Sequence, residues 1–187
     1  LSRRQRQMCI RDRLYTYSEE SKEADFVASD IRYVSQPDFV GTEFHISGKY
    51  DMEVRLGIPG LFNVVNALAA VSVCSFLGLD QARISHALEN IRVNGRMEIV
   101  YTSERCTVLV DYAHNAVSME SLLSTLRDYK PKRLVCVFGC GGNRSKDRRY
   151  SMGEIGGKMA DLSIITADNS RYEKVEDIIA DIRGSIE

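Results

Sequence analysis

The sequence has no stretch of apolar residues long enough to cross a membrane. A spanning helix needs roughly 18 or more consecutive apolar residues, and no such run occurs. The basic residues near the start are not followed by the apolar segment typical of a secretory signal. With 44% hydrophobic and 27% charged residues, the composition is that of an ordinary globular protein. We therefore expect a cytoplasmic protein with no membrane partner.

Cysteine pairs with metal-binding spacing are also missing. None of the five cysteines forms a C-x-x-C pair, and the two closest, Cys136 and Cys140, flank the end of a predicted strand. This pattern is typical of reduced thiols in a cytosolic protein. We predict reduced thiols and no metal site in this chain.

The first residues of the chain do not resemble part of a folded domain. Residues 3–12, RRQRQMCIRD, back-translate in frame into a transposon-type sequencing adapter. A natural basic arm for nucleic acid is the competing interpretation. We exclude residues 1–13 from the fold and expect the natural protein to begin upstream. Without the four arginines and one aspartate of residues 3–12, the formal charge changes from −1 to −4. A net negative charge does not indicate a nucleic-acid partner.

Residues 24–58 have the alternation of an antiparallel sheet. ADFVAS and IRYVS are short β-rich runs, and TEFHIS has Phe44 and Ile46 on one face. DMEVRLGI alternates strictly, with the apolar side formed by Met52, Val54, Leu56 and Ile58. The link at residues 48–51 suits a hairpin.

The period then changes to that of helices. The segment LFNVVNALAAVSVCSFLG is apolar nearly all round, which predicts a buried helix that ends at Gly78. Asp80 can cap a second helix, whose apolar face carries Ile84, Leu88 and Ile91. The glycine-containing segment VNGRME, residues 93–98, breaks this pattern, and we expect a domain boundary there.

Strands and helices alternate after this boundary. We predict strands at 107–112, 133–138 and 162–166, and helices at 116–128, 150–160 and from 174 onward. Continuous apolar strands separated by helices predict an α/β fold with a parallel, doubly wound sheet. Ligands bind beyond the carboxyl ends of such strands. Three polar clusters lie at these ends: Asp111–Asn115, Gly139–Arg144 and Asp168–Arg171.

Two features of the first half could bind a ligand. Asn63 and Asn66 lie one helical turn apart, so both amides can face the same way. An adenine or a phosphate would supply the partners that a buried Asn66 needs, whereas capping of the helix is the alternative for Asn63. Arg96 offers a fork of donors that suits a triphosphate or an acyl phosphate, unless it forms an interdomain salt bridge.

The first two polar clusters of the second half are weaker signals. Asp111 could accept from ribose hydroxyls or bind a metal through water, and His114 could be a nucleotide contact or a structural residue. No serine or cysteine beside them has the setting of a nucleophile, so we predict no catalytic triad. The loop FGCGGNR permits close backbone approach and ends at Arg144, but neither G-x-G-x-x-G nor G-x-x-x-x-G-K-[ST] occurs.

The segment from Asp168 to Arg171 matches the two charged ends of an amino acid. Arg171 could pair bidentately with a carboxylate, while Asp168 and Asn169 accept from an ammonium group. The alternative is an Asx turn that caps the following helix. Because the segment follows a strand and Arg144 follows the neighbouring strand, we favour amino-acid binding.

Taken in order, these motifs resemble the Mur ligase family, and within it the MurE type. IPGLFNVVNALAA, GRMEIV, VDYAH, FGCGGNRSKDRRYSMGEI and TADNSRYE occur in the family's order and spacing, and the resemblance covers residues 14–187. It implies that residues 14–98 are the C-terminal portion of a central ATPase domain, with antiparallel strands plus helices. Residues 99–187 would be the N-terminal portion of a Rossmann-like domain that binds an amino acid. Both domains are expected to be incomplete.

The resemblance also implies roles for individual residues. The positions that match residues around ATP are Asn63, Asn66, Arg96, Asp111 and His114. The positions that match the amino-acid site are Arg144, Asp168, Asn169, Ser170 and Arg171. Arg96 would act in catalysis by steadying phosphate charge. ATP and Mg²⁺ are implied as cofactors, although the family's phosphate loop and metal ligands would lie upstream of this chain.

The implied reaction is an amide ligation in peptidoglycan synthesis. ATP would phosphorylate the D-Glu γ-carboxylate of UDP-MurNAc-L-Ala-D-Glu, and an amine of meso-diaminopimelate would attack the resulting acyl phosphate. Arg171 would hold the distal carboxylate of diaminopimelate. Ser170 and Asn94 each stand where the family commonly has proline. DYAHNAVSM replaces the more usual T-P-D-A and resembles folylpolyglutamate synthetases.

Two other functions remain open from the sequence. One is a related ligase that adds lysine or glutamate, and the other is a non-catalytic Mur-like binding protein, suggested by the missing catalytic half. Without a phosphate loop, we expect the chain as given to be inactive and to hydrolyse no ATP. We also expect a monomer.

Overall fold

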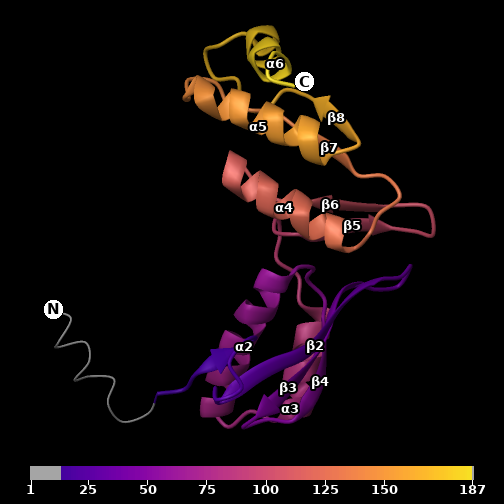
Figure 1. The fold of residues 1–187 in the computed structure, drawn as a ribbon, viewed down its shortest axis with the longest axis vertical. Coiled ribbons are helices and arrows are strands. Elements are labelled where there is room, and N and C mark those ends of the chain that lie inside the picture. Colours follow the sequence, from indigo (N-terminus) through magenta and orange to yellow (C-terminus); the bar gives the residue numbers. More distant parts are fainter. Residues whose placement is uncertain (1–13, 187) are drawn as a thin grey trace, which may run out of the picture. The chain divides into compact units, whose positions relative to one another are not determined.

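The computed structural model describes residues 14–186, whose helices and strands are labelled in Figure 1. The described residues divide into two compact units between Val110 and Asp111. The predicted adapter segment lies outside the described residues. Each unit has its own hydrophobic core. No helix within residues 14–186 combines the length and the hydropathy that a membrane span requires.

The first unit is built on a four-stranded sheet with the order β1-β2-β3-β4. Only the β1–β2 pair is parallel, and the others are antiparallel. The strands are β1 (Tyr17–Ser18), β2 (Phe26–Ser35), β3 (Val40–Gly48) and β4 (Met52–Leu56). Two helices contribute to the same core as the sheet: α2 (Leu61–Phe76) and α3 (Gln81–Asn90).

The predicted alternation of the strands is confirmed. Phe44 and Ile46 of β3 are buried, because alternate residues of a strand point to the same face. Ile46 pairs with Met52 across the predicted hairpin. The two runs expected in the region of β2 form one strand, whose register shifts between Ser29 and Arg32. A bulge therefore replaces the expected break.

The two helices begin and end largely as predicted. Gly78 follows α2 with φ 73°, the left-handed conformation that glycine adopts without strain. Asp80 caps α3 by accepting from the backbone N–H of Ala82 at 2.9 Å. The expectation that α2 is buried all round is wrong within this unit, since Phe62 and Val73 are exposed. The sheet covers one face of the helix, and only that face makes apolar contacts within this unit.

A hairpin of β5 (Glu98–Thr102) and β6 (Thr107–Val110) ends the first unit along the chain. The run at 107–112 was expected to join the parallel sheet. It pairs instead with β5, because a four-residue link at 103–106 brings the two runs together and Ser103 N–H donates to the Cys106 carbonyl at 2.9 Å.

The second unit alternates helix and strand, which confirms the α/β prediction. Its elements are α4 (Ala116–Asp128), β7 (Val135–Phe138), α5 (Lys146–Met159), β8 (Leu162–Ile165) and α6 (Val175–Arg183). β7 and β8 pair in parallel and are connected through α5. The core contains Met119 and Leu123 of α4, Met152 of α5 and Ile178 and Ile182 of α6. Val137 and Ile164 are exposed, so one face of this strand pair is uncovered within the unit.

Candidate functional site

The loops that follow β7 and β8 meet at the same edge of the second unit. Two parallel strands end on the same side of a sheet, so their outgoing loops are neighbours. The Thr166 N–H donates to the Phe138 carbonyl at 2.9 Å, and the Gly142 N–H donates to the Asn169 carbonyl at 2.8 Å. The structure therefore brings the cluster at Gly139–Arg144 against the cluster at Asp168–Arg171.

This contact depends on the absence of a side chain at Gly142. A Cβ atom built there would overlap the carbonyl oxygen of Ser170. At Gly141 the corresponding Cβ would lie 3.5 Å from the Asn169 carbonyl oxygen, an ordinary contact. The glycine-rich loop thus provides close approach of one backbone to another.

Asn143 binds the second loop through both its backbone and its side chain. Its backbone N–H donates to Glu173 Oε1, and its Oδ1 accepts from the Tyr172 N–H at 3.2 Å. Asn143 and Arg171 both lie in the left-handed region, with φ 52° each. Such a conformation is costly for arginine and persists where neighbouring contacts hold it.

The predicted amino-acid-binding side chains are available to a ligand. Within residues 14–186, no hydrogen bond engages the side chains of Arg144, Asp168, Asn169 or Arg171, and all four residues are exposed. The Asx-turn alternative is wrong, because Lys174 occupies the N-cap of α6 and that helix has no side-chain cap. Ser170 is half-buried, and its carbonyl accepts from the Glu173 N–H at 3.0 Å.

A buried arginine lies behind these loops, and the sequence analysis did not identify it. Arg149 of α5 is 1% exposed, and its guanidinium donates to Glu173 Oε1 at 2.8 Å and to Asp181 Oδ2 at 2.9 Å. The helix was expected to begin at residue 150 but begins at Lys146, because the Ser145 side chain caps it through the Asp147 N–H. Ser145 was the signal that could have placed Arg149 on a helix.

The hydrogen bonds from Arg149 hold the pKa values of the Glu173 and Asp181 carboxyls below their usual range. A carboxyl with a lowered pKa in the folded state stabilises the fold at neutral pH, and this contribution is lost as the pH falls below about 4 and the group is protonated. We expect the free energy of unfolding to decrease over this acidic range. Chemical denaturation at several pH values between about 3 and 7 measures it.

The matched control for this pH dependence is the double variant Glu173→Gln, Asp181→Asn. Neither replacement can titrate, so the free energy of unfolding of the variant should depend less on pH than that of the unmodified chain. If both proteins lost stability in parallel, other carboxyls would carry the effect. Asp161 is one such group, since Arg127 lowers its pKa in the same direction.

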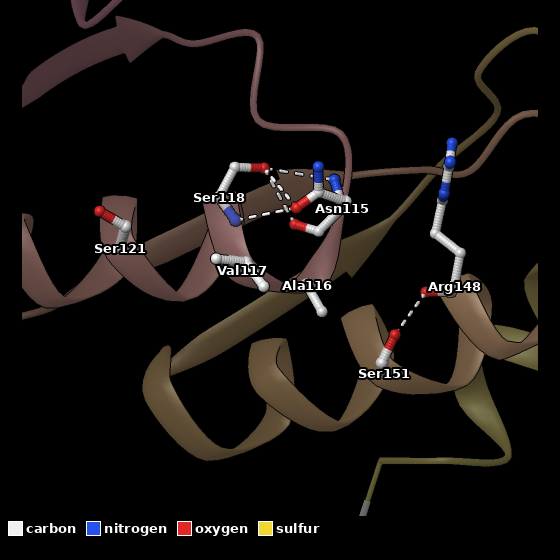
Figure 2. Close-up of a pocket in the computed structure, with 7 residues that line it drawn as sticks. All are labelled: Asn115, Ala116, Val117, Ser118, Ser121, Arg148 and Ser151. Atoms are coloured by element: carbon white, nitrogen blue, oxygen red, sulfur yellow. Dashed lines mark hydrogen bonds between the residues drawn. The ribbon is translucent and has the colours of Figure 1, made fainter. Parts of the chain in front are cut away.

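The polar cluster at Asp111–Asn115 directly precedes α4 and caps it. Asp111 Oδ1 accepts from the Ala113 N–H at 2.8 Å, and His114 Nδ1 lies 3.2 Å from the Tyr112 carbonyl oxygen. Asn115 caps α4, exchanging hydrogen bonds with Ser118. Figure 2 shows this cap on one side of a shallow groove, with Arg148 and Ser151 of α5 on the other.

The groove in Figure 2 has a volume of about 690 Å³ and is open to solvent. Its lining residues are Asn115, Ala116, Val117, Ser118, Ser121, Arg148 and Ser151. Among the predicted site residues, none lines it, although His114 directly precedes Asn115 in the chain.

The asparagine pair of the first unit lies together, as predicted. Asn63 Nδ2 donates to the Pro59 carbonyl at 2.7 Å, and Asn66 Nδ2 donates to Asn63 Oδ1 at 3.2 Å. The capping alternative for Asn63 is wrong, because Gly60 is the N-cap residue. Asn66 was expected to be buried but is exposed, so its amide can reach a ligand.

Arg96 lies in a turn between α3 and β5 and is exposed. Its backbone N–H donates to the Val93 carbonyl at 3.1 Å. Gly95 and Met97, on either side of it, both have positive φ, at 66° and 46°. Arg96 therefore lies between two residues in the left-handed conformation, which is costly for Met97.

Metal-ligating residues do not cluster in the described part of the chain. No group of three or more His, Cys, Asp or Glu side chains there is arranged to hold a metal ion. The cysteines at 74, 106, 136 and 140 are free thiols. Burial raises the pKa of the Cys136 and Cys140 thiols, which makes them poorer ligands and nucleophiles.

Comparison with protein families matches both parts of the chain. The model of the Mur ligase middle domain matches residues 3–74, and that of the Mur ligase glutamate ligase domain matches residues 95–187.

Curated relatives with one name cover most of the chain. The UDP-N-acetylmuramoyl-L-alanyl-D-glutamate--2,6-diaminopimelate ligase of Alkaliphilus oremlandii is 42% identical over 168 residues, which are 89% of this chain and 34% of the relative. The ligase of the same name from Clostridioides difficile is 39% identical over 174 residues, 92% of this chain and 35% of the relative. The chain thus spans about a third of the length of these relatives.

Solved structures show the same fold. A UDP-N-acetylmuramoyl-L-alanyl-D-glutamate--2,6-diaminopimelate ligase superposes with a TM-score of 0.68 at 31% identity, covering 92% of this chain and 35% of that one. A folylpolyglutamate synthase from Thermotoga maritima superposes with a TM-score of 0.76 at 21% identity, covering 98% of this chain and 42% of that one. The second likeness concerns the fold alone. On the two matched domains and these relatives, the chain belongs to the Mur ligase family.

Proposed function

We propose that the protein that carries this chain is an ATP-dependent ligase that adds meso-diaminopimelate to UDP-MurNAc-L-Ala-D-Glu in peptidoglycan synthesis. The observation that carries the proposal is the meeting of the β7 and β8 loops, which gathers side chains that have no hydrogen bonds within residues 14–186. The names of the relatives point to the same substrate pair.

The available groups complement diaminopimelate better than lysine. Diaminopimelate has a carboxylate and an ammonium group at each end, whereas lysine has a carboxylate at only one end. Arg144 and Arg171 offer two guanidinium forks for two carboxylates, and Asp168 and Asn169 offer oxygens for an ammonium group. With lysine, one of the two guanidinium groups would have no carboxylate partner.

ATP would be held by the remaining predicted residues. An asparagine amide can pair with the N6 and N7 edge of adenine. Asn66 is exposed and its orientation is set by Asn63, so we assign it this contact. Arg96 would steady phosphate charge as the catalytic arginine, and Asp111 and His114 would contact the nucleotide. The described residues have no ligand cluster for Mg²⁺, so we assign the metal no residue of this chain.

The contribution of these residues to the reaction is the positioning of two reactants. ATP activates the D-Glu γ-carboxylate as an acyl phosphate, and the amine must then reach that carbonyl carbon. Fixing both ends of diaminopimelate converts this attack into an effectively intramolecular step. We propose that the reaction takes place in the cytoplasm and that the protein is a monomer.

We also propose that residues 14–98 belong to the ATP-binding domain and residues 99–187 to the amino-acid-binding domain. The family models support a boundary in this region, since their matches end at 74 and begin at 95. The compact units divide slightly later, after Val110, because β5 and β6 pair with each other.

The test is a ligation assay of the full-length protein with ATP and UDP-MurNAc-L-Ala-D-Glu. Diaminopimelate, lysine and glutamate are supplied in separate reactions, and phosphate release and product mass are measured. We expect an amide product with diaminopimelate and little with the other two. A product formed only with lysine or glutamate would overturn the substrate assignment. No product with any of the three would overturn the ligase function.

A further inference from the structure

The ion cluster of Arg149, Glu173 and Asp181 contains none of the residues proposed to bind the amino acid. We propose that Arg149, Glu173 and Asn143 form a positioning clamp that sets the distance between Arg144 and Arg171, and thereby selects an amino acid with two carboxylates. This inference rests on the proposed function, because it names what determines the specificity of the same site.

The clamp joins the two loops beside the two substrate-binding arginines. Asn143 directly precedes Arg144 in the loop after β7. Through its backbone N–H and its Oδ1 it holds Glu173 and Tyr172, and Tyr172 directly follows Arg171. The hydrogen bonds therefore join the two loops at positions that are one residue away from Arg144 and from Arg171. Two contacts to one residue restrain rotation as well as distance.

Glu173 connects this clamp to the core of the unit. Its Oε1 accepts from Asn143 and also from Arg149 Nη2, at 2.8 Å. Arg149 is 1% exposed, and its other terminal nitrogen donates to Asp181 of α6 at 2.9 Å. The planar guanidinium has donors in a fixed geometry, so Arg149 holds the Glu173 carboxylate in a defined position beside α5. The loops are thus anchored to α5 through Glu173.

The strained backbone of the loops agrees with a positioning role. Asn143 and Arg171 are both left-handed, and neither is glycine. Residues in such conformations return to ordinary ones when the contacts that hold them are removed. Removing the Glu173 carboxylate should therefore release both loops, and the two arginines would lose their spacing.

The two carboxylates that share Arg149 provide a matched pair of variants. Glu173 contacts both Arg149 and the loop residue Asn143, whereas Asp181 pairs with Arg149 and Lys146 on α5. Glu173→Ala removes the clamp and one ion pair. Asp181→Ala removes the other ion pair of the same buried arginine but leaves the contacts of Glu173 with Arg149 and Asn143 in place. A merely structural role would make the two variants alike.

The experiment measures KM for diaminopimelate, KM for ATP, kcat and the thermal midpoint of both variants of the full-length protein. We expect Glu173→Ala to raise KM for diaminopimelate about tenfold and to leave KM for ATP unchanged. Asp181→Ala should lower the thermal midpoint but leave both KM values unchanged. Glu173→Gln should restore part of the affinity, because its Oε1 still accepts from Asn143. Equal changes of KM in the two alanine variants, or none in either, would overturn the clamp.

A second measurement separates the clamp from the ligase function. Amide hydrogen exchange of residues 139–144 and 168–173, without substrate, should accelerate in Glu173→Ala and stay unchanged in Asp181→Ala. If the unmodified protein ligated none of the three amino acids, the proposed function would fail while this measurement still decided the clamp. Equal exchange in the two variants would refute the clamp whatever the activity.

Discussion

Replacing Arg171 by alanine is expected to lower kcat/KM for diaminopimelate about 100-fold in the full-length protein, because a desolvated substrate carboxylate would lose its guanidinium partner. The activity with lysine, which has no distal carboxylate, should change far less. The measurement is kcat/KM with each amino acid as the varied substrate. The ratio of the two values is the quantity that Arg171 is proposed to control.

A second variant separates the effect of losing the guanidinium from the effect of straining the backbone at position 171. Arg171 has φ 52°, so Arg171→Gly removes the charge while fitting the left-handed conformation without strain. Equal losses in Arg171→Ala and Arg171→Gly would assign the effect to the guanidinium. Arg183→Ala, an exposed arginine in the last turn of α6, is the control for a general change of charge. The assignment fails if diaminopimelate use survives in Arg171→Ala while lysine use falls.

Replacing Gly142 by alanine is the second substitution for which we expect a large effect. The new Cβ would overlap the Ser170 carbonyl oxygen, a backbone atom that cannot rotate away. The loops after β7 and β8 would have to separate, and a displacement of about 1 Å in a positioned substrate can cost roughly 100-fold in rate. We therefore expect a decrease of this size in kcat/KM for diaminopimelate. Overpacking should also destabilise the fold by about 1–3 kcal/mol.

Gly141→Ala is the matched control, because it places the same methyl group one residue earlier. Its Cβ would lie 3.5 Å from the Asn169 carbonyl oxygen, an ordinary van der Waals distance. Neither glycine has a positive φ, so the backbone preference of alanine affects both alike. We expect Gly141→Ala to keep nearly full activity. Equal losses in the two variants would mean that close approach at Gly142 is not what matters.

Local periodicity predicted the elements whose neighbours are close in the chain. Helix α4 occupies Ala116–Asp128, the predicted range, because Asn115 and Ser118 supply a cap just before a regular apolar face. The alternation around Phe44 and Ile46 likewise predicted which residues are buried. Helix α5 was predicted to start too late, because residues 138–149 are rich in glycine and arginine and were assigned to a loop.

Pairing of strands was less predictable than their existence. The run at 107–112 is apolar enough for a parallel sheet, but the short link after β5 favours a hairpin. Periodicity describes one segment at a time and contains no information on which strand lies beside it. The exposed position of Asn66 shows the same limit, since an apolar helix sequence does not reveal which face the sheet covers.

The sequence by itself determined the family, the order of the motifs and the side chains that could read an amino acid, because these depend on residue types and their spacing. Only the tertiary structure decided how those side chains are held. Gly142 against Ser170, and Arg149 between Glu173 and Asp181, are contacts between residues 24 to 32 positions apart. Such contacts form only when two parallel strands and two helices have packed together. A local pattern of residues therefore could not predict them.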